Sequence, residues 1–283
     1  MPPDVRSDHP WRYDGRRVVV TGCASGIGMQ TVGQLSDLGA EVIGLDRRRP
    51  EVGLDQFHDV DLADPTSIDR ISAAIGDGVD GLFNVAGVSS GAGNPRYVVS
   101  VNFLGLRHLT AALVPKMRPG SAIVNVSSLA ARDYRRDAAA VTGLAATRTV
   151  AEGLAWCDDH PKDMADGGSY RVAKGAVIFY TQSQAETLAK QGIRINCTCP
   201  GVTDTPILRD TERAFGRDYI DQIPKPLGRV ARASEQAAVL LFLNSPAASY
   251  LTGEVLWVDG GFASSLRARE LLAHAHSSGH EGG

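Results

Sequence analysis

The stretch VVVTGCASGIG, residues 18–28, is an apolar, β-branched run that breaks into a glycine-rich turn and continues as a helical pattern. Gly22 permits a tight reversal, Gly26 lets the backbone approach a pyrophosphate, and Gly28 lets the helix pack closely on the strand. The first turn of the helix offers free N–H groups to phosphates. Glycine-rich loops after strands are common, so this turn predicts a dinucleotide site only together with further signals.

One such signal is Asp46, which ends the apolar strand pattern that follows the turn. An acid at this place can accept hydrogen bonds from a ribose 2′-hydroxyl. A 2′-phosphate would meet it as a like charge, so Asp46 favours NAD over NADP. The adjacent Arg47 weakens that preference.

Composition indicates one large α/β domain: the chain has 283 residues, of which 43% are hydrophobic and 22% are charged. The formal net charge is −3 and no basic block stands out, so neither nucleic acid nor an anionic membrane is expected as a partner. No signal peptide or spanning helix is predicted, and a cytoplasmic protein is expected. Cys197 and Cys199 alternate along a strand without a second pair, which favours packing over metal ligation.

Strand patterns alternate with helical stretches along the chain. Because the strands are apolar along their length, the pattern predicts a doubly wound, Rossmann-like parallel sheet of about seven strands in a single domain. The predicted strands are 18–21, 42–46, 57–60, 82–86, 122–127, 193–199 and 255–258.

The helical and terminal segments are predicted as follows. A helix over 27–38 stops at Gly39, and Asp64 caps a second helix that opens with Pro65. A long helix over 97–117 carries Asn102, which needs either solvent or a buried partner. The expected domain covers 15–264, after an arm over 1–14 in which Trp11 and Tyr13 tuck against the domain edge. A tail follows over 265–283, and its histidines, His274, His276 and His280, are expected to bind nothing specific.

The second signal is the pair Tyr170 and Lys174, which lie four positions apart on a predicted helix and therefore share a face. A free tyrosine has a pKa near 10 and is a poor base at neutral pH. A nearby ammonium group, together with a positive nicotinamide ring, favours the phenolate and predicts a lowered pKa for Tyr170. Taken alone, the spacing is far more typical of an ordinary exposed helix pair.

Together, the glycine turn and this pair resemble the signatures of the short-chain dehydrogenase/reductase superfamily. The resemblance runs from about residue 15 to residue 262 and includes several further motifs in the family's order. These are Asp61-Leu62, Asn84-Val85-Ala86-Gly87 with Phe83 in place of a first asparagine, Asn125-Val126-Ser127-Ser128, Pro200-Gly201 with Thr205-Pro206, and Asp259-Gly260-Gly261.

The resemblance implies a catalytic set. Tyr170 is the acid/base, Ser128 hydrogen-bonds the substrate oxygen, and Lys174 lowers the tyrosine pKa and contacts the nicotinamide ribose. Asn102 holds a water that links Lys174 to solvent. Ser127 is the rival for the serine role, and Ser128 is preferred because it is the second of the pair.

The resemblance also implies NAD as cofactor, a small-molecule alcohol or carbonyl substrate, and no metal. The cofactor-binding residues it implies are Gly22, Ser25, Gly26, Ile27, Gly28, Asp46, Asp61, Leu62, Asn84, Ala86, Gly87, Tyr170, Lys174, Pro200, Gly201, Val202 and Thr205.

One departure from the family pattern is an insertion. Tyr170 follows Ser128 by 42 positions, far more than the family usually shows, and the extra segment over about 132–168 is predicted to form one or two helices. In the wider family the helices carrying Asn102 and Tyr170 pair across a two-fold axis. The insertion would crowd that surface, so a homodimer through the face around residues 255–262 is expected.

The insertion resembles a bacterial subgroup that contains coniferyl-alcohol dehydrogenase and 3α-hydroxysteroid dehydrogenase/carbonyl reductase. Stretches 21–24 and 99–102 look like the steroid enzyme, and 42–47, 104–106 and 153–156 look closer to the coniferyl enzyme. A substrate lid is expected over about 205–226, where apolar side chains mix with nearly balanced charges. The expectation is an NAD-dependent dehydrogenase of a bulky, largely apolar alcohol, with the steroid activity as one alternative. A catalytically silent NAD-sensing protein is the other.

Overall fold

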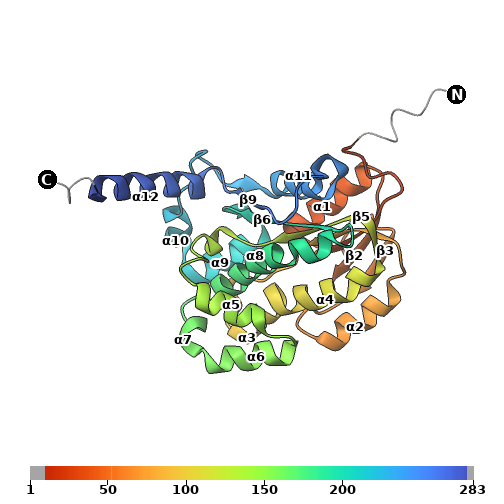
Figure 1. Cartoon of the computed structure of the whole chain (residues 1–283), viewed down its shortest axis with the longest axis horizontal. Coiled ribbons are helices and arrows are strands. Elements are labelled where there is room, and N and C mark those ends of the chain that lie inside the picture. Colours follow the sequence, from red (N-terminus) through yellow and green to blue (C-terminus); the bar gives the residue numbers. More distant parts are fainter. Residues whose placement is uncertain (1–9, 52, 279–283) are drawn as a thin grey trace.

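The structure, a computed structural model, describes residues 10–51 and 53–278 (Figure 1). Seven parallel strands form one sheet in the order β3-β2-β1-β4-β5-β6-β9. Their bounds are β1 Arg17–Thr21, β2 Glu41–Asp46, β3 Gln56–Asp59, β4 Val79–Asn84, β5 Met117–Val126, β6 Arg194–Pro200 and β9 Val255–Val258. Each predicted strand overlaps one of them, so the predicted doubly wound parallel sheet is confirmed.

Helices cover both faces of the sheet, because successive side chains of each strand point to opposite faces. Val18 and Val20 pack into the core beneath α1 and α11, whereas Val19 joins the core beneath α2 and α4. The catalytic-helix candidate, α8, lies over β5 and β6 on the second face. The bounds are α1 Gly26–Asp37, α2 Pro65–Ala74, α4 Gly105–Leu113, α8 Gly168–Ala189 and α11 Ala233–Asn244.

Local signals set the helix ends as predicted. After α1 the chain turns at Gly39, whose φ is +87°. The Asp64 carboxylate caps α2 by accepting a hydrogen bond of 2.9 Å from the backbone N–H of Thr66. Both ends therefore follow from residue types that satisfy free backbone groups.

The predicted helix over 97–117 is interrupted. It consists of α3 (Pro95–Val99), a π-helical turn (Ser100–Leu104), α4 and a short 3₁₀ turn (Val114–Lys116). The cause is Asn102, whose side-chain N–H donates to the carbonyl of Val98 four residues earlier. A side chain that donates to this carbonyl competes with the backbone N–H that would otherwise donate to it in an α-helix. The wider π turn accommodates the side-chain hydrogen bond.

The same stretch, Pro95–Lys116, is long and apolar enough to cross a membrane by length and composition alone. Within the structure 72% of its most apolar window is buried, and it packs against α2 and α8. A helix in the core of a globular domain can have the same length and apolar composition. The burial and contacts of this segment are those of such a core helix.

The insertion forms helices α5 (Ala138–Ala146) and α6 (Val150–Asp159), followed by the single turn α7 (Pro161–Met164). The sequence predicted one or two helices, and the extra turn begins at Pro161, a residue suited to a first helical position. Apolar side chains of the insertion share one core cluster with α8 and β6, where Cys197 and Cys199 are fully buried. The two cysteines therefore serve packing, as predicted.

The predicted lid region contains α9 (Pro206–Phe215) and α10 (Arg217–Gln222). The remaining elements are a two-stranded sheet of β7 (Thr203–Asp204) with β8 (Ala231–Arg232), and 3₁₀ turns at Ser90–Ala92, Leu129–Ala131 and Pro246–Ala248.

The two ends of the described chain differ. Tyr13 is fully buried and donates a hydrogen bond of 2.6 Å to the carbonyl of Leu241, while Trp11 stacks on Phe242. Instead of the expected tail, Phe262–Ser278 forms helix α12, which extends away from the domain (Figure 1). Its run of Leu, Ala, Arg and Glu is a strong helix-forming composition. Residues 1–9 and 279–283, with His280, and the side chain of His276 lie outside what the structure describes.

Candidate active site

A cavity of about 1140 Å³ lies beyond the carboxyl ends of the parallel strands. It opens where the order of strands reverses between β1 and β4, the usual ligand-binding crevice of such sheets. All of the site residues predicted from the sequence line this cavity except Asn84. The cavity therefore joins the glycine turn to the residues on α8.

The glycine turn is packed so closely that side chains would not fit. A Cβ on Gly28 would lie 2.1 Å from the Gly22 carbonyl oxygen, and a Cβ on Gly22 would lie 2.8 Å from Cα of Ala86. Gly26 has a φ of +53°, which favours glycine. The turn thus presents bare backbone and the start of α1 to the cavity, as a phosphate cradle requires.

Asp46 lies at the cavity end of β2. Its two carboxylate oxygens accept hydrogen bonds from the backbone N–H groups of Ala24 (3.0 Å) and Arg48 (3.1 Å), which fix it beside the glycine turn. Arg47 also lines the cavity, with its guanidinium 6.0 Å from the ring centre of Tyr97. Both a carboxylate and a cation therefore line this end of the cavity.

Asn84 is a correction to the predicted cofactor contacts. Its side chain is buried, and its amide N–H groups donate to Thr110 Oγ1 (3.0 Å) and Asn125 Oδ1 (2.9 Å). As the last residue of β4, it points into the protein rather than into the cavity. Its amide therefore ties β4 to β5 and α4.

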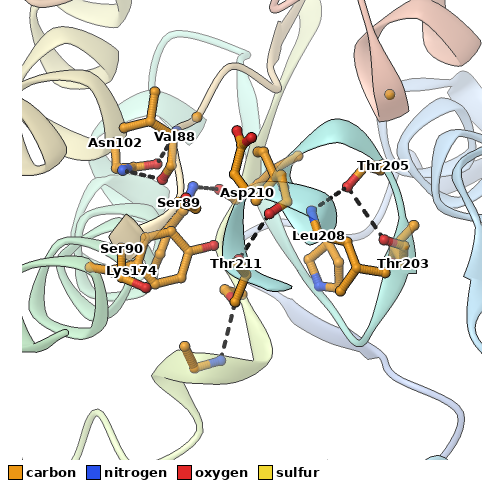
Figure 2. A pocket seen from close by; sticks show the side chains of 18 of the residues that line it. Val88, Ser89, Ser90, Asn102, Lys174, Thr203, Thr205, Leu208, Asp210 and Thr211 are labelled. Carbon is orange, nitrogen blue, oxygen red and sulfur yellow. Dashed lines mark hydrogen bonds between the residues drawn. The ribbon is translucent and has the colours of Figure 1, made fainter. Parts of the chain in front are cut away.

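Asn102 is fully buried at the π turn. Its side-chain N–H groups donate to the carbonyls of Val88 (3.0 Å) and Val98 (2.9 Å), and its oxygen accepts from the Val88 N–H (Figure 2). Both amide donors are used, so the side chain fixes the loop after β4 rather than presenting free donors to a water. A Cβ on Gly87 would lie 2.8 Å from its oxygen.

Tyr170 and Lys174 lie one turn apart on α8, with the lysine Nζ 5.8 Å from the tyrosine ring centre. Lys174 is buried and donates a hydrogen bond of 2.9 Å to the carbonyl of Val126, at the end of β5. Burial disfavours the charged ammonium and lowers the pKa of Lys174 to about 8.

The structure separates the two candidate serines. Ser127 donates its hydroxyl to the backbone carbonyl of Lys174 at 2.7 Å, which uses its only donor within the protein. The side chain of Ser128 lies close enough to Tyr170 to lower the pKa of the phenol, and it accepts a hydrogen bond of 3.1 Å from the backbone N–H of Ala130. Ser128, not Ser127, is therefore the serine beside the phenol.

The predicted lowering of the tyrosine pKa is not what the structure shows. Burial raises the pKa of Tyr170 above its ordinary value, and the hydrogen bond with Ser128 opposes that rise in part. The phenol is therefore the stable form at neutral pH in the chain alone.

The segment after β6 forms another wall of the cavity. A Cβ on Gly201 would lie 2.7 Å from Cα of Asp259, so this backbone passes directly over the turn after β9. Thr205 bridges the Thr203 carbonyl and the N–H of Leu208 at the start of α9 (Figure 2). These bonds connect the cavity wall to the lid helices.

Several cavity residues were not predicted individually from the sequence. Ser89 and Ser90 follow the β4 strand end, Arg132 and Asp166 lie at the two ends of the insertion, and Phe262 begins α12. The signal available for them was position, because each lies within four positions of a motif residue. Both ends of the insertion therefore reach the cavity.

Helix α9, in the predicted lid region, packs on the 3₁₀ turn Ser90–Ala92. A Cβ on Gly91 would lie 2.7 Å from Cβ of Ala214 and 3.1 Å from the carbonyl oxygen of Asp210. The apolar side chains Ile207, Leu208, Phe215, Tyr219, Ile220 and Ile223 of the lid line the cavity. In residues 10–51 and 53–278 no group of three or more His, Cys, Asp or Glu side chains is arranged to hold a metal.

The cavity therefore has a phenol and a serine hydroxyl beside a buried amine in one part and the exposed backbone of the glycine turn in another. A phenol in this place can exchange a proton with a substrate oxygen, and the cradle suits a dinucleotide.

Two family models match the chain. The model described as "short chain dehydrogenase" matches residues 16–142, and the model described as "Enoyl-(Acyl carrier protein) reductase" matches residues 161–263. The interval between them, residues 143–160, falls within the insertion.

Relatives match over nearly their whole length. The chain is 37% identical over 251 residues to coniferyl-alcohol dehydrogenase of Pseudomonas sp. strain HR199, covering 88% of this chain and 97% of that protein. It is 31% identical over 267 residues to 3-alpha-hydroxysteroid dehydrogenase/carbonyl reductase of Comamonas testosteroni, covering 90% and 99%. Among solved structures, the 3-alpha-hydroxysteroid dehydrogenase of Pseudomonas sp. B-0831 complexed with NADH matches with a TM-score of 0.78 and 31% identity, covering 89% and 98%.

Proposed function

This chain belongs to the short-chain dehydrogenase/reductase family of oxidoreductases, and we propose that it transfers a hydride between NAD and a bulky, largely apolar alcohol. The observation that carries this proposal is the cluster of Ser128, Tyr170 and Lys174 in the same cavity as the glycine turn. A binding protein has no need of a phenol placed beside a second hydroxyl and a buried amine. The cluster therefore favours an enzyme over a silent NAD sensor.

The cavity suits NAD in three respects. The turn around Gly22 and Gly28 leaves room for a pyrophosphate, the start of α1 supplies N–H groups, and Asp46 faces the place of a ribose. We assign Asp61 and Leu62 to the adenine end and Pro200–Val202 with Thr205 to the nicotinamide end; all of them line the cavity. When bound, NAD supplies the hydride chemistry.

The protein's own groups handle the proton. We assign Ser128 to hold the substrate oxygen and Tyr170 to exchange a proton with it as general acid or base. Lys174, held by the Val126 carbonyl, places a cation beneath the phenol and so stabilises the phenolate when Tyr170 gives up its proton. Asn102 fixes the Gly87–Val88 loop that forms the adjoining wall.

Two observations support a bulky, apolar substrate. The lid lines its side of the cavity with six apolar side chains, which can exclude water around the reaction. Two of the four carboxylates in the lid form ion pairs, Asp210 with Arg213 and Asp221 with Arg217. A cinnamyl-type alcohol such as coniferyl alcohol is the first choice, because the relative named for it is 37% identical. A 3α-hydroxysteroid is the second, supported by the relative and the solved structure named for that activity.

The test is the rate of NAD reduction by the purified protein, followed by absorbance of the reduced cofactor. Coniferyl alcohol, a 3α-hydroxysteroid and a short aliphatic alcohol are compared by kcat/KM, with Tyr170→Phe as the blank. Coniferyl alcohol is expected to have the highest kcat/KM. A higher kcat/KM for the steroid would favour the second candidate. A higher kcat/KM for the aliphatic alcohol would contradict the proposal of a bulky substrate. Binding of NAD without turnover of any alcohol or the matching carbonyl compounds would favour the sensor.

A further inference from the structure

We infer that the insertion over residues 132–168 positions the site residues carried on helices, Asn102, Tyr170 and Lys174. This inference rests on the proposed function. Each of the three has, one or two positions further along the chain, a residue held directly by the insertion. The insertion is therefore part of what sets the geometry of proton transfer, in addition to covering the outside of α8.

Beside Lys174, helix α5 packs against the backbone of α8. A Cβ on Gly175 would lie 2.6 Å from Cγ2 of Val141 and 3.3 Å from Cβ of Tyr134. Val141 is buried and has a stiff, β-branched side chain. Because neither atom is the end of a flexible side chain, an alanine at 175 would require α5 and α8 to move apart.

Beside Tyr170, the insertion makes an ion pair. Arg171 Nε donates to Asp137 Oδ2 at 2.7 Å, and Asp137 directly precedes α5. This bond connects the first turn of α8 to the first turn of α5. The start of the helix that carries the phenol is therefore held from the side opposite the sheet.

Beside Asn102, helix α6 packs on the π turn. A Cβ on Gly153 would lie 2.4 Å from Cδ2 of Leu104, the last residue of that turn. The absence of a side chain at 153 is what lets α6 approach the turn this closely. The third site residue is thus braced by the same insertion.

The insertion is itself anchored to the domain. The Arg107 guanidinium, on α4, donates to Thr147 Oγ1 (3.2 Å) and to the carbonyls of Thr147 and Thr149 in the connection between α5 and α6. Leu144 and Val150, at the two ends of this connection, belong to the core cluster that also contains α8 side chains. These contacts fix the insertion to the domain, so it can hold α8 and the π turn in place.

The test is Gly175→Ala, alone and combined with Val141→Ala, which removes the atom that the new Cβ would meet. Gly33→Ala in α1 is the matched control, because a Cβ there meets nothing within 4 Å. Gly175→Ala should lower kcat about tenfold or more and shift its pH profile, while the KM for NAD stays within about twofold of wild type. The double variant should recover most of the lost kcat with the original pH profile. Wild-type kcat and pH profile in Gly175→Ala, or no recovery in the double variant, would overturn the inference.

If Gly175→Ala does not fold, Asp137→Asn is the variant that tests the inference. It keeps the shape of the side chain and removes only the charge that holds Arg171. A lowered kcat with a shifted pH profile supports positioning, and an unchanged profile contradicts it. If wild type turns over no substrate, the proposed function fails on its own. Positioning is then read from amide hydrogen exchange over residues 168–176, which should be faster in Asp137→Asn than in Gly33→Ala.

Discussion

The side chain of Ser128 lies beside the phenol of Tyr170 and lowers its pKa, whereas the hydroxyl of Ser127 donates a hydrogen bond to the backbone carbonyl of Lys174 in α8. Tyr170→Phe should abolish turnover and leave the Kd for NAD within about threefold, because only the proton-exchanging group is lost. Ser128→Ala should lower kcat/KM by about a hundredfold, and Ser127→Ala by much less. Steady-state kinetics and NAD titration by fluorescence check this. Equal losses in the two serine variants would return Ser127 to the catalytic role.

The depressed pKa of Lys174 makes stability depend on pH. Between about pH 8 and the ordinary lysine value, the unfolded chain binds a proton at this side chain that the folded chain has lost. Stability from this group therefore rises with pH, and the cost of burying the charge is fully present below pH 8. Relative to Lys174→Met, wild type should gain about 2 kcal/mol in free energy of unfolding between pH 7.5 and 9.5.

Urea unfolding of both proteins at the two pH values measures this difference. Both samples contain the same other titrating groups, so their contributions cancel in the comparison. Parallel changes in the two proteins would contradict a depressed lysine pKa.

Cofactor choice depends on Asp46, whose carboxylate is fixed by two backbone N–H groups. Wild type should have a kcat/KM for NAD at least about tenfold above that for NADP, because a 2′-phosphate would meet the carboxylate as a like charge. Asp46→Asn keeps the shape of the side chain and should reduce the ratio of kcat/KM for NAD to kcat/KM for NADP. Glu41→Gln at the other end of β2 is the control. Higher efficiency of wild type with NADP would show that Arg47 determines the choice.

Residue identities were more predictable than their environments. Tyr170, Lys174 and the glycines could be found by spacing, because their function requires a fixed geometry along the chain. The direction of the Tyr170 pKa shift could not, since it depends on burial by segments distant in sequence. Asn84 was misassigned for the same reason: only the register of β4 with β5 shows that its amide reaches Asn125.

At the scale of elements, the lid α9 and the turn Ser90–Ala92 touch at Gly91. Gly91→Ala should hold the lid away from its seat and raise the KM for the alcohol about fivefold, because the closed lid covers the substrate end. Ala214→Gly in the same chain removes the opposing Cβ and should restore much of the affinity. The comparison is made by steady-state kinetics at saturating NAD. An unchanged KM in Gly91→Ala would show that closure does not need this contact.

The seven strands and the ends of α1 and α2 were predictable from local pattern, because burial on both faces and capping leave direct marks on the sequence. The insertion was predicted instead by comparing the spacing of Ser128 and Tyr170 with the spacing usual in the family. The π turn was not, since it depends on the contact of Asn102 with Val88 from another segment. Helix α12 was missed because the Ser and Gly residues near the end of the chain resemble a tail, although residues 266–273 favour a helix.

At the scale of the molecule, α5 and α6 lie over the helices that carry Asn102 and Tyr170. A second copy could not pair directly through those helices, so we expect a dimer through the face around Val255–Val258 and Phe262, about twice the 30.0 kDa chain mass. Light scattering coupled to size exclusion measures the mass, and Trp257→Glu on the proposed face should shift it to the monomer. A stable tetramer would refute the prediction.

The insertion also has a consequence for chain entropy. It lies within the connection between β5 and β6, residues 127–193, and makes up roughly half of that connection. Closing a loop of doubled length costs only about 0.6 kcal/mol more. Burying a single side chain such as Leu144 contributes about 1.5–3 kcal/mol. The entropy lost on loop closure therefore opposes an insertion between β5 and β6 only weakly. The inserted helices are stable as long as burial of their apolar side chains offsets the entropy lost when their backbone becomes ordered.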